Sequence, residues 1–268
     1  MKLWYQSLGA SRAAKTGPYV KRLNDLVARA SAPGTTVDVY GLSEGRAIAD
    51  QYRYLEYLDT QEILQNGLRA EREGYDAFLI GNIFEPGLHA LRELINIPVL
   101  GLCESSVHVA CLMGSSFSVV NVNPKFTRRV VENITSYGLA SRLVSIDRMQ
   151  VERAAVFDSA YEKPEVRTAI VDQFIEAARA GIAKGAEAVI PAGGSAMALL
   201  AHADIHQVDN APIVNGVIAL VKVGEMAVGM RQITGSFTSK RMTYAAPSGP
   251  LLEDIRRFYG PDIYPGAV

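Results

Sequence analysis

A strand–turn–helix–strand pattern that occurs twice constrains the fold of this chain more than any other feature. Residues 74–88 read GYDAFLIGNIFEPGL, and residues 185–199 read GAEAVIPAGGSAMAL. In each copy a glycine, one further residue, an acid and an alanine precede a short apolar run, which breaks at a glycine-containing turn before a helix-like segment. A proline-led apolar segment follows each copy, IPVLGL at 97–102 and APIVNG at 211–216. Such a duplication predicts two similar lobes that face each other.

The rest of the chain continues the alternation of strands and helices. Proline opens several of the expected helices, as at Pro18, Pro86, Pro124 and Pro164, where a fixed φ suits the first turn. A looser stretch separates two of these elements at 147–162. Strands are expected at 3–8, 35–42, 76–83, 97–103, 116–122, 142–146, 186–194 and 211–216, and long helices at 49–73, 164–184, 195–203 and 217–231, with a closing helix near the C-terminus. Strands that alternate with helices indicate an α/β fold of parallel sheets covered on both faces.

The duplication also suggests how the lobes divide the chain and where a ligand binds. We expect lobe one to comprise residues 1–112, completed by 217–268, and lobe two to comprise residues 113–216. Ligands of parallel α/β folds bind beyond the carboxyl ends of the strands. The site is therefore expected in a cleft between the lobes, between Asn82 and Gly193–Gly194.

Composition excludes several functional classes. A formal net charge of −1 gives no electrostatic reason to expect nucleic acid or an anionic membrane as partner. The N-terminal sequence lacks the pattern of a secretory signal, and no apolar run reaches the roughly 18 residues of a membrane span. The two cysteines, Cys103 and Cys111, fit reduced thiols, so we expect a cytoplasmic protein. No nucleotide fingerprint occurs and the histidine spacing matches no metal site, so neither a cofactor nor a metal is expected.

The residues from Tyr75 to Lys125 resemble the aspartate/glutamate/hydantoin racemase superfamily, and hydantoin racemases most of all. The likeness extends to the second copy of the repeat and covers most of the chain from residue 1 to about 231. It implies two flavodoxin-like lobes related by a pseudo-twofold axis, with a small substrate between them, and makes a homo-oligomer plausible. In members that use cysteine, the resemblance implies one thiol from each lobe, at the turn after the repeated strand.

This chain departs from that pattern at both thiol positions. The family string G-C-x-x-[DE]-P-G is Gly81–Gly87 here, with Asn82 at the position of the first thiol. The second thiol would be expected between Ala192 and Ala196, where Gly194 is the nearest match. Neither asparagine nor glycine removes a proton from carbon at neutral pH. We therefore expect a cofactor-independent enzyme that acts on a small carboxylate, amide or cyclic amide by cysteine-free hydrolase or lyase/isomerase chemistry. The alternatives are a racemase or epimerase with non-standard bases, and a small-molecule binding protein without catalysis.

Four residues are candidates for the catalytic groups. Glu104 follows a strand end and either activates water or serves only as an acid at a helix start. Cys103 is either a single thiol base or a buried packing residue. Ser195 is a nucleophile, a polar contact or a helix cap, and His202 is its nearest imidazole, although it lies seven residues further on.

The expected binding groups are mostly backbone amides and uncharged side chains. Helices that start after Gly81–Pro86 and after Gly193–Ser195 offer free N–H groups to a carboxylate or a developing oxyanion. Polar groups at the ends of other strands would orient the ligand. The predicted binding residues are Gln6, Ser7, Tyr40, Asn82, Ile83, Asn121, Gly193 and Gly194.

Overall fold

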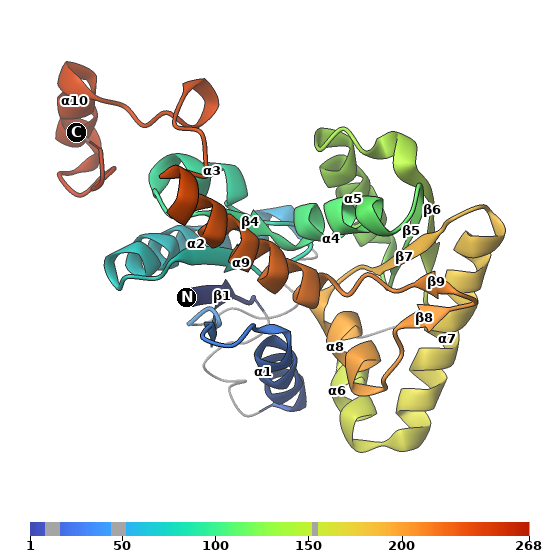
Figure 1. Cartoon of the computed structure of the whole chain (residues 1–268). Coiled ribbons are helices and arrows are strands. Elements are labelled where there is room, and N and C mark those ends of the chain that lie inside the picture. Colours follow the sequence, from blue (N-terminus) through green and yellow to red (C-terminus); the bar gives the residue numbers. More distant parts are fainter. Residues whose placement is uncertain (9–16, 44–51, 152–154, 268) are drawn as a thin grey trace.

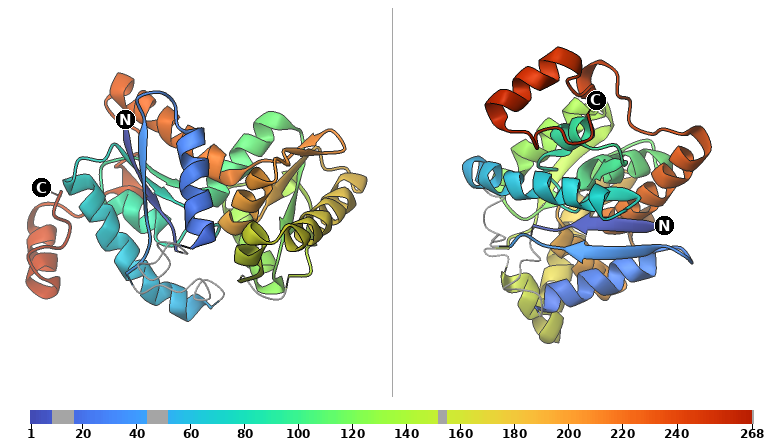
Figure 2. Two further views of the ribbon diagram at one scale, coloured as in Figure 1. Left: turned by 90° about the horizontal axis from the view of Figure 1, so that it is seen from below. Right: turned by 90° about the vertical axis from the view of Figure 1, so that its left-hand side faces the viewer.

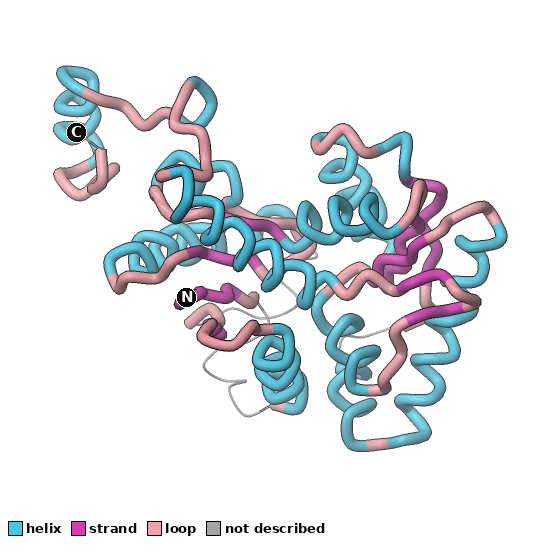
Figure 3. The backbone as a smooth tube through the Cα atoms, viewed as in Figure 1, coloured by secondary structure: helices cyan, strands magenta, loops and turns pink. Residues whose placement is uncertain are grey.

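The larger strands of this protein form two separate parallel sheets, each flanked by helices, and two short strands form an antiparallel hairpin (Figures 1 and 3). The structure is a computed structural model, and it describes residues 1–8, 17–43, 52–151 and 155–267. Seen from below, the two sheets lie side by side. The sheet formed by the N-terminal part of the chain lies in one lobe, and the sheet formed by the middle of the chain lies in the other (Figure 2). The predicted α/β fold with two parallel-sheet lobes is confirmed.

The first sheet has the order β2-β1-β3-β4 and all of its pairs are parallel. Its strands are almost wholly apolar, and the strand side chains of β3 and β4 are buried, as expected of a sheet covered on both faces. The bounds are β1 Lys2–Gln6, β2 Thr36–Tyr40, β3 Ala77–Ile80 and β4 Val99–Gly101.

The second sheet repeats this order. It runs β6-β5-β7, with β5 Phe117–Asn121, β6 Leu143–Arg148 and β7 Ala188–Pro191, and again every pair is parallel. A parallel bridge between Val189 and Ile213 stands where a fourth strand would follow β7. The two copies of the sequence repeat therefore supply equivalent strands, β3 and β7, of two sheets with the same topology.

Helices cover both sheets. The helices that pack on the first sheet and its edges are α1 Pro18–Ala30, α2 Arg53–Arg72, α3 Leu88–Leu94, α4 Leu102–Met113 and α9 Gly216–Thr234. Those of the second are α5 Pro124–Ser136, α6 Ala155–Glu162, α7 Pro164–Ala183 and α8 Gly194–His202. Although α9 follows the second sheet in sequence, it packs against α4, α1 and β3, and Gly224 of α9 fits closely over Leu79. The lobe boundaries themselves stay a prediction.

Helix α1 links the two lobes at its first turn. The backbone N–H of Tyr19 donates to the Asp158 carboxylate of α6 at 3.3 Å, and α1 also packs against α8. One cluster of buried apolar residues includes Leu23 of α1, Leu79 of β3 and Val119 of β5. The hydrophobic core is therefore continuous between the lobes.

The C-terminal segment projects from the first lobe and ends in helix α10, Gly249–Tyr259 (Figure 1). It is attached through Lys240, whose ammonium group donates to the carbonyl oxygens of Arg92, Glu93 and Ile95 at the end of α3. Such cations favour the negative end of a helix dipole.

Four boundaries differ from the sequence predictions. The strand expected at 97–103 ends at Gly101, so Cys103 and Glu104 belong to the first turn of α4. The helix expected at Pro86 begins at Leu88, because Glu85 and Gly87 have positive φ and form a turn first. The looser stretch at 147–162 contains α6. Instead of one strand at 211–216 there is a short antiparallel hairpin of Gln207–Val208 with Ala211–Pro212. No described helix has the length and apolarity needed to cross a membrane.

Candidate functional site

The turns after the two repeated strands lie against each other, and we call this place the turn junction: Gly81–Asn82 after β3 and Gly193–Ser195 after β7. A Cβ atom added to Gly194 would lie 4.0 Å from the Gly81 carbonyl oxygen. The same position would lie only 2.8 Å from the hydroxyl oxygen of Tyr19, in the first turn of α1. Three elements from distant parts of the chain thus converge at Gly194, which leaves no room for a side chain there unless the phenol shifts.

The Asn82 side of the junction is held by hydrogen bonds. The side-chain oxygen of Asn82 accepts from the backbone N–H of Phe84 at 2.8 Å, an Asx turn that fixes the chain as it leaves β3. The Ile83 carbonyl accepts from the side-chain amide of Asn133, on α5 of the second lobe, at 3.2 Å. Ile83 and Asn82 are both largely buried. The first lobe's turn is therefore tied to the second lobe.

The Gly194 side of the junction is the N-terminus of α8. Gly193 is its N-cap with φ of 124°, a conformation that suits glycine, and no side chain caps the helix. The first N–H groups of a helix have no partner within it, and they lie at the positive end of the dipole. Half-buried Ser195 stands in this first turn. This end of α8 can bind an anion or a developing oxyanion.

Two tyrosines that the sequence analysis did not single out flank the turn junction. The ring of Tyr5, on β1, packs against Gly81 so closely that a Cβ there would lie 2.2 Å from a ring carbon. Tyr19 approaches Gly194 from the other side. In the sequence, both look like ordinary core residues of a strand and a helix; only the meeting of the lobes gives them a place at the junction.

Behind the turn, buried Glu85 joins several elements. One of its oxygens accepts from the backbone N–H of Glu104 at 2.7 Å, near the start of α4, and the other accepts from the hydroxyl of Tyr137, just beyond α5. Burial raises the pKa of the Glu85 carboxyl to about 8, against the opposing effect of these hydrogen bonds. In the sequence, only its place in the family string distinguishes Glu85 from other acidic residues.

The structure places Glu104 in an ion pair. Its two oxygens accept from the Arg92 guanidinium at 3.0 and 2.5 Å, and the same guanidinium donates to the Val99 carbonyl. Both carboxylate oxygens are thus engaged by a partner on α3. A role for Glu104 as general base stays a prediction, and this geometry favours a structural role.

Cys103 is buried in the core beside this pair. Burial raises the pKa of the Cys103 thiol well above its usual value, and the neighbouring Glu85 and Glu104 raise it further. A thiolate there is disfavoured. Cys111 lies partly buried near the other end of α4, and neither residue is at the turn junction.

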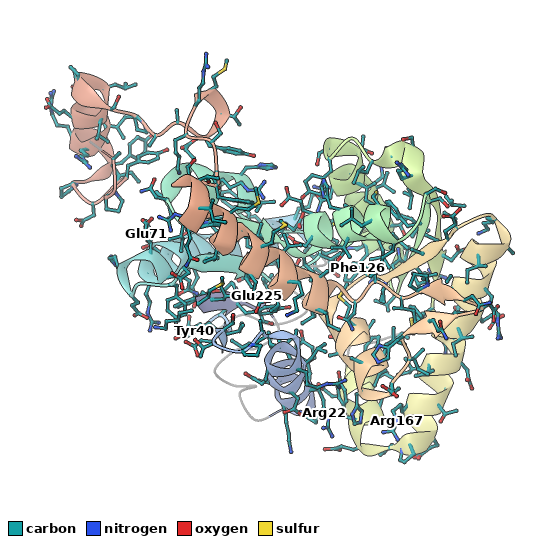
Figure 4. The ribbon with its side chains drawn as sticks, viewed as in Figure 1. Arg22, Tyr40, Glu71, Phe126, Arg167 and Glu225 are labelled. Atoms are coloured by element: carbon teal, nitrogen blue, oxygen red, sulfur yellow. The ribbon has the colours of Figure 1, made fainter. Side chains whose placement is uncertain are left out.

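Ser195 and His202 are not brought together. They occupy the first and last turns of α8, about two helical turns apart. His202 lines a groove between α1 and α8 with Arg22, Asp25 and Arg29. Burial lowers the pKa of His202, and so do the nearby guanidiniums of Arg22 and Arg167 (labelled in Figure 4). No nucleophile–base pair forms from these two residues.

The other predicted binding residues lie at strand ends but differ in their surroundings. The buried Gln6 side-chain oxygen accepts from Trp4 and Asn66, and the Ser7 N–H donates to the Tyr40 carbonyl. The Tyr40 ring stacks on Trp4 at 3.6 Å, on the face of the sheet opposite Tyr5. Tyr40 therefore lies on the α2 side of the sheet.

Asn121, at the end of β5, is fully buried. Its amide nitrogen donates to the Thr127 hydroxyl at 2.6 Å, whereas its side-chain oxygen has no partner among the described residues. The part of the chain that the structure describes contains no group of three or more His, Cys, Asp or Glu side chains arranged to hold a metal ion.

The comparisons with known proteins agree with this architecture. The family model for Asp/Glu/hydantoin racemases matches residues 16–224. A hydantoin racemase from Pseudomonas sp. (strain NS671) is 35% identical over 204 residues, 76% of either chain, and one from Rhizobium meliloti is 31% identical over 67% of this chain and 69% of its own. Among solved structures, allantoin racemase from Pseudomonas fluorescens has a TM-score of 0.76 at 24% identity, covering 93% of this chain and 98% of its own, a likeness of fold. This chain therefore belongs to the Asp/Glu/hydantoin racemase family and is an enzyme of that superfamily.

Proposed function

We propose that this protein is an isomerase that inverts a carbon centre next to a carbonyl group in a small cyclic amide of the hydantoin type, without the use of thiols. The observation that carries the proposal is the turn junction, where Gly194 meets both the Gly81 carbonyl and the Tyr19 hydroxyl. The substrate class comes from the hydantoin racemases to which the chain is similar. Among the reactions expected from the sequence, the proposal takes up the racemase with non-standard bases rather than a hydrolase, because the described residues offer no nucleophile–base pair at Ser195.

Removal of a proton from carbon next to a carbonyl leaves negative charge on the carbonyl oxygen. The free N–H groups at the start of α8 are suited to stabilise that oxyanion, because they are fixed in place before the reaction and lie in a half-buried region. The Asn82 side chain, already fixed by its bond to Phe84, would border the substrate on the opposite side.

We infer that the groups that carry protons are not thiols, because the positions that we matched to the family's thiols, 82 and 194, are asparagine and glycine. The whole sequence has two cysteines, and both lie on α4. Tyr19 places an ionisable hydroxyl in the space that a side chain at position 194 would need. We assign Tyr19 as the group that takes the proton on the α8 side of the substrate. Water then delivers a proton to the opposite face, which inverts the carbon, and the proton held by Tyr19 is released to solvent.

The proposal is tested by incubating the wild-type protein with enantiopure 5-alkyl hydantoins. Optical rotation would follow inversion, and chromatography would follow ring opening in the same samples. We expect rotation to decay to zero with the ring intact. Ring opening without racemisation would instead establish a hydrolase and overturn the proposal.

A matched pair of variants locates the activity. Asn82→Asp keeps the acceptor for the Phe84 N–H but adds a negative charge at the turn junction, which opposes a developing oxyanion. Asn24→Asp adds the same charge at an exposed position of α1. We expect only Asn82→Asp to lose activity; equal rates in the two variants would place the reaction elsewhere.

One observation favours a second candidate. Tyr19 brings an ionisable hydroxyl to Gly194, whereas Asn82, in the turn of the first lobe, has no ionisable side chain. A proton delivered to one face only suits a lyase that removes carbon dioxide from a substituted malonate and protonates the resulting enolate. A single product enantiomer from a malonate, with no racemisation of hydantoins, would favour that reaction.

A further inference from the structure

The side chain of Tyr5 presents an unusual buried group. Tyr5 is fully buried, and its hydroxyl makes no hydrogen bond to any described residue. A buried hydroxyl without a partner costs on the order of 1–3 kcal/mol, because it gives up its bonds to water and gains none. Such groups are uncommon in native proteins, and each calls for an explanation.

The position of the Tyr5 hydroxyl supplies an explanation for its lack of a partner. The Tyr5 oxygen lies 2.5 Å from the point where a Cβ on Gly81 would stand, so the ring occupies the space that the glycine leaves free. Gly81 is the residue whose carbonyl oxygen faces Gly194 across the turn junction. The unpartnered hydroxyl is therefore beside the first turn of the junction, at the carboxyl end of the first sheet.

Two effects keep the Tyr5 phenol protonated. Burial raises its pKa well above the usual value for tyrosine, and the nearby Tyr19 hydroxyl adds to the effect. A protonated phenol is a hydrogen-bond donor, and it becomes a stronger stabiliser as negative charge grows on its acceptor.

We propose that the Tyr5 hydroxyl donates a hydrogen bond to the substrate carbonyl oxygen on which negative charge develops, and that Tyr5 is thus a catalytic residue of this enzyme. The inference rests on the proposed function, because it assigns a donor to the oxyanion of that reaction. It also specifies the ligand: a carbonyl oxygen must face β1 while the N-terminus of α8 contacts the other side of the same group. In the absence of ligand, the hydroxyl remains without a partner.

Tyr5→Phe tests the inference because it removes only the oxygen. Loss of one oxyanion donor lowers kcat about 100-fold or more. The free energy of unfolding, measured by urea denaturation without ligand, is expected to stay equal to wild type or to rise, since the lost hydroxyl had no partner. This combination of lower kcat with undiminished stability would not result from a structural role.

Tyr75→Phe is the matched control. Tyr75 is also a buried tyrosine of the first lobe, but its hydroxyl bonds to Asp38 at 2.7 Å and to Tyr40 at 2.8 Å, on the other face of the sheet. Its loss should lower stability and leave kcat within a few-fold of wild type. The two variants are thus expected to show opposite patterns.

The outcomes separate the inference from the proposed function. Wild type that racemises hydantoins, together with a Tyr5→Phe variant that does so at a similar rate, would overturn the role of Tyr5 alone. Wild type that shows no reaction with hydantoins would contradict the proposed function instead. If Tyr5→Phe does not fold, a fluorinated tyrosine at position 5, which keeps the ring and strengthens the donor, gives the answer through infrared spectroscopy of a bound carbonyl-labelled hydantoin. A lower carbonyl stretching frequency than in wild type is expected, and equal frequencies would overturn the inference.

Discussion

The hydroxyl oxygen of Tyr19 lies 2.8 Å from the point where a Cβ on Gly194 would stand. Real Cβ atoms essentially never show so short a contact, so a side chain at position 194 requires the Tyr19 phenol to shift. Position 194 is the nearest match to the place where the family resemblance implies a thiol. We propose that the Tyr19 hydroxyl from α1 takes the place of that group.

Gly194→Ala tests this contact. Alanine in the first turn of a helix normally stabilises relative to glycine by up to about 1 kcal/mol, but here the methyl group must displace the Tyr19 hydroxyl. We expect the free energy of unfolding to fall, or not to rise, and activity on hydantoins to drop at least tenfold. Gly229→Ala is the control, because a Cβ at this α9 position meets nothing within 4 Å.

Adding Tyr19→Phe to Gly194→Ala removes the atom that the methyl group meets. The double variant should recover the stability gain of Gly229→Ala without recovering activity, as measured by urea denaturation and by racemisation rate. Equal stability in Gly194→Ala and Gly229→Ala would contradict the contact.

Glu85 should make stability depend on pH. Its pKa is raised to about 8 in the folded protein, mainly by burial, so the neutral form is the one that folding favours. Its contribution is fully present below the ordinary glutamate pKa near 4.5 and is lost as the pH rises toward 8, at most about 1.4 kcal/mol per pH unit. Urea denaturation at pH 5.5 and 8.5 should show lower stability at the higher pH.

Glu85→Gln removes the titration while keeping an acceptor for the Glu104 N–H and a polar contact for Tyr137. It should flatten the dependence between pH 5 and 8, whereas Glu253→Gln, at an exposed position of α10, should not. A dependence that persists unchanged in Glu85→Gln would show that another group is responsible.

The ion pair of Glu104 with Arg92 predicts a structural phenotype. The side chains are 20% and 12% exposed, so Glu104→Gln leaves a largely buried guanidinium without its counter-charge. We expect a loss of about 2 kcal/mol or more in unfolding free energy, with kcat within a few-fold of wild type. A hundredfold fall in kcat at unchanged stability would restore Glu104 as the general base.

Cys103 should be inert toward thiol reagents in the folded protein. Its burial and its raised pKa both disfavour the reactive thiolate, while Cys111 is partly exposed. With a chromogenic disulfide reagent, we expect Cys111 to react first and Cys103 only on unfolding. Rapid reaction of Cys103 in the native protein, measured in Cys111→Ala, would be inconsistent with its place in the core.

The fold could be predicted from the sequence because its signals are local. The apolar runs that became β3 and β7 are each bounded by glycine, and the prolines at 18, 124 and 164 do open helices. The helix at 155–162 was missed because it is short and follows a strand without a clear cap. The symmetry of the repeat also predicts a site between Asn82 and Gly193–Gly194, and the structure brings these two turns together; the site itself stays a prediction.

The individual site residues could not be predicted in the same way. Tyr5 and Tyr19 reach the turn junction only when β1, α1 and α8 pack together. The sequences of β1 and α1 alone do not indicate that these side chains contact Gly81 and Gly194. Glu104 was attractive as an acid after a strand, yet its partner Arg92 lies on the preceding helix, and strand β4 ends two residues earlier than the apolar run suggested. Chemistry assigned from strand ends alone misses such tertiary partners.

The most direct test of cysteine-free proton transfer is hydrogen exchange at carbon in the thiol-free variant Cys103→Ala/Cys111→Ala. Proton NMR in D2O would follow the hydrogen at the chiral carbon of a 5-alkyl hydantoin while optical rotation is recorded, with circular dichroism to verify the fold. We predict deuterium incorporation with loss of rotation at a rate within a few-fold of wild type, and a large decrease when Tyr19→Phe is added. A correctly folded thiol-free protein that no longer exchanges this hydrogen, while wild type does, would contradict cysteine-free proton transfer. It would show that a cysteine takes part in the reaction.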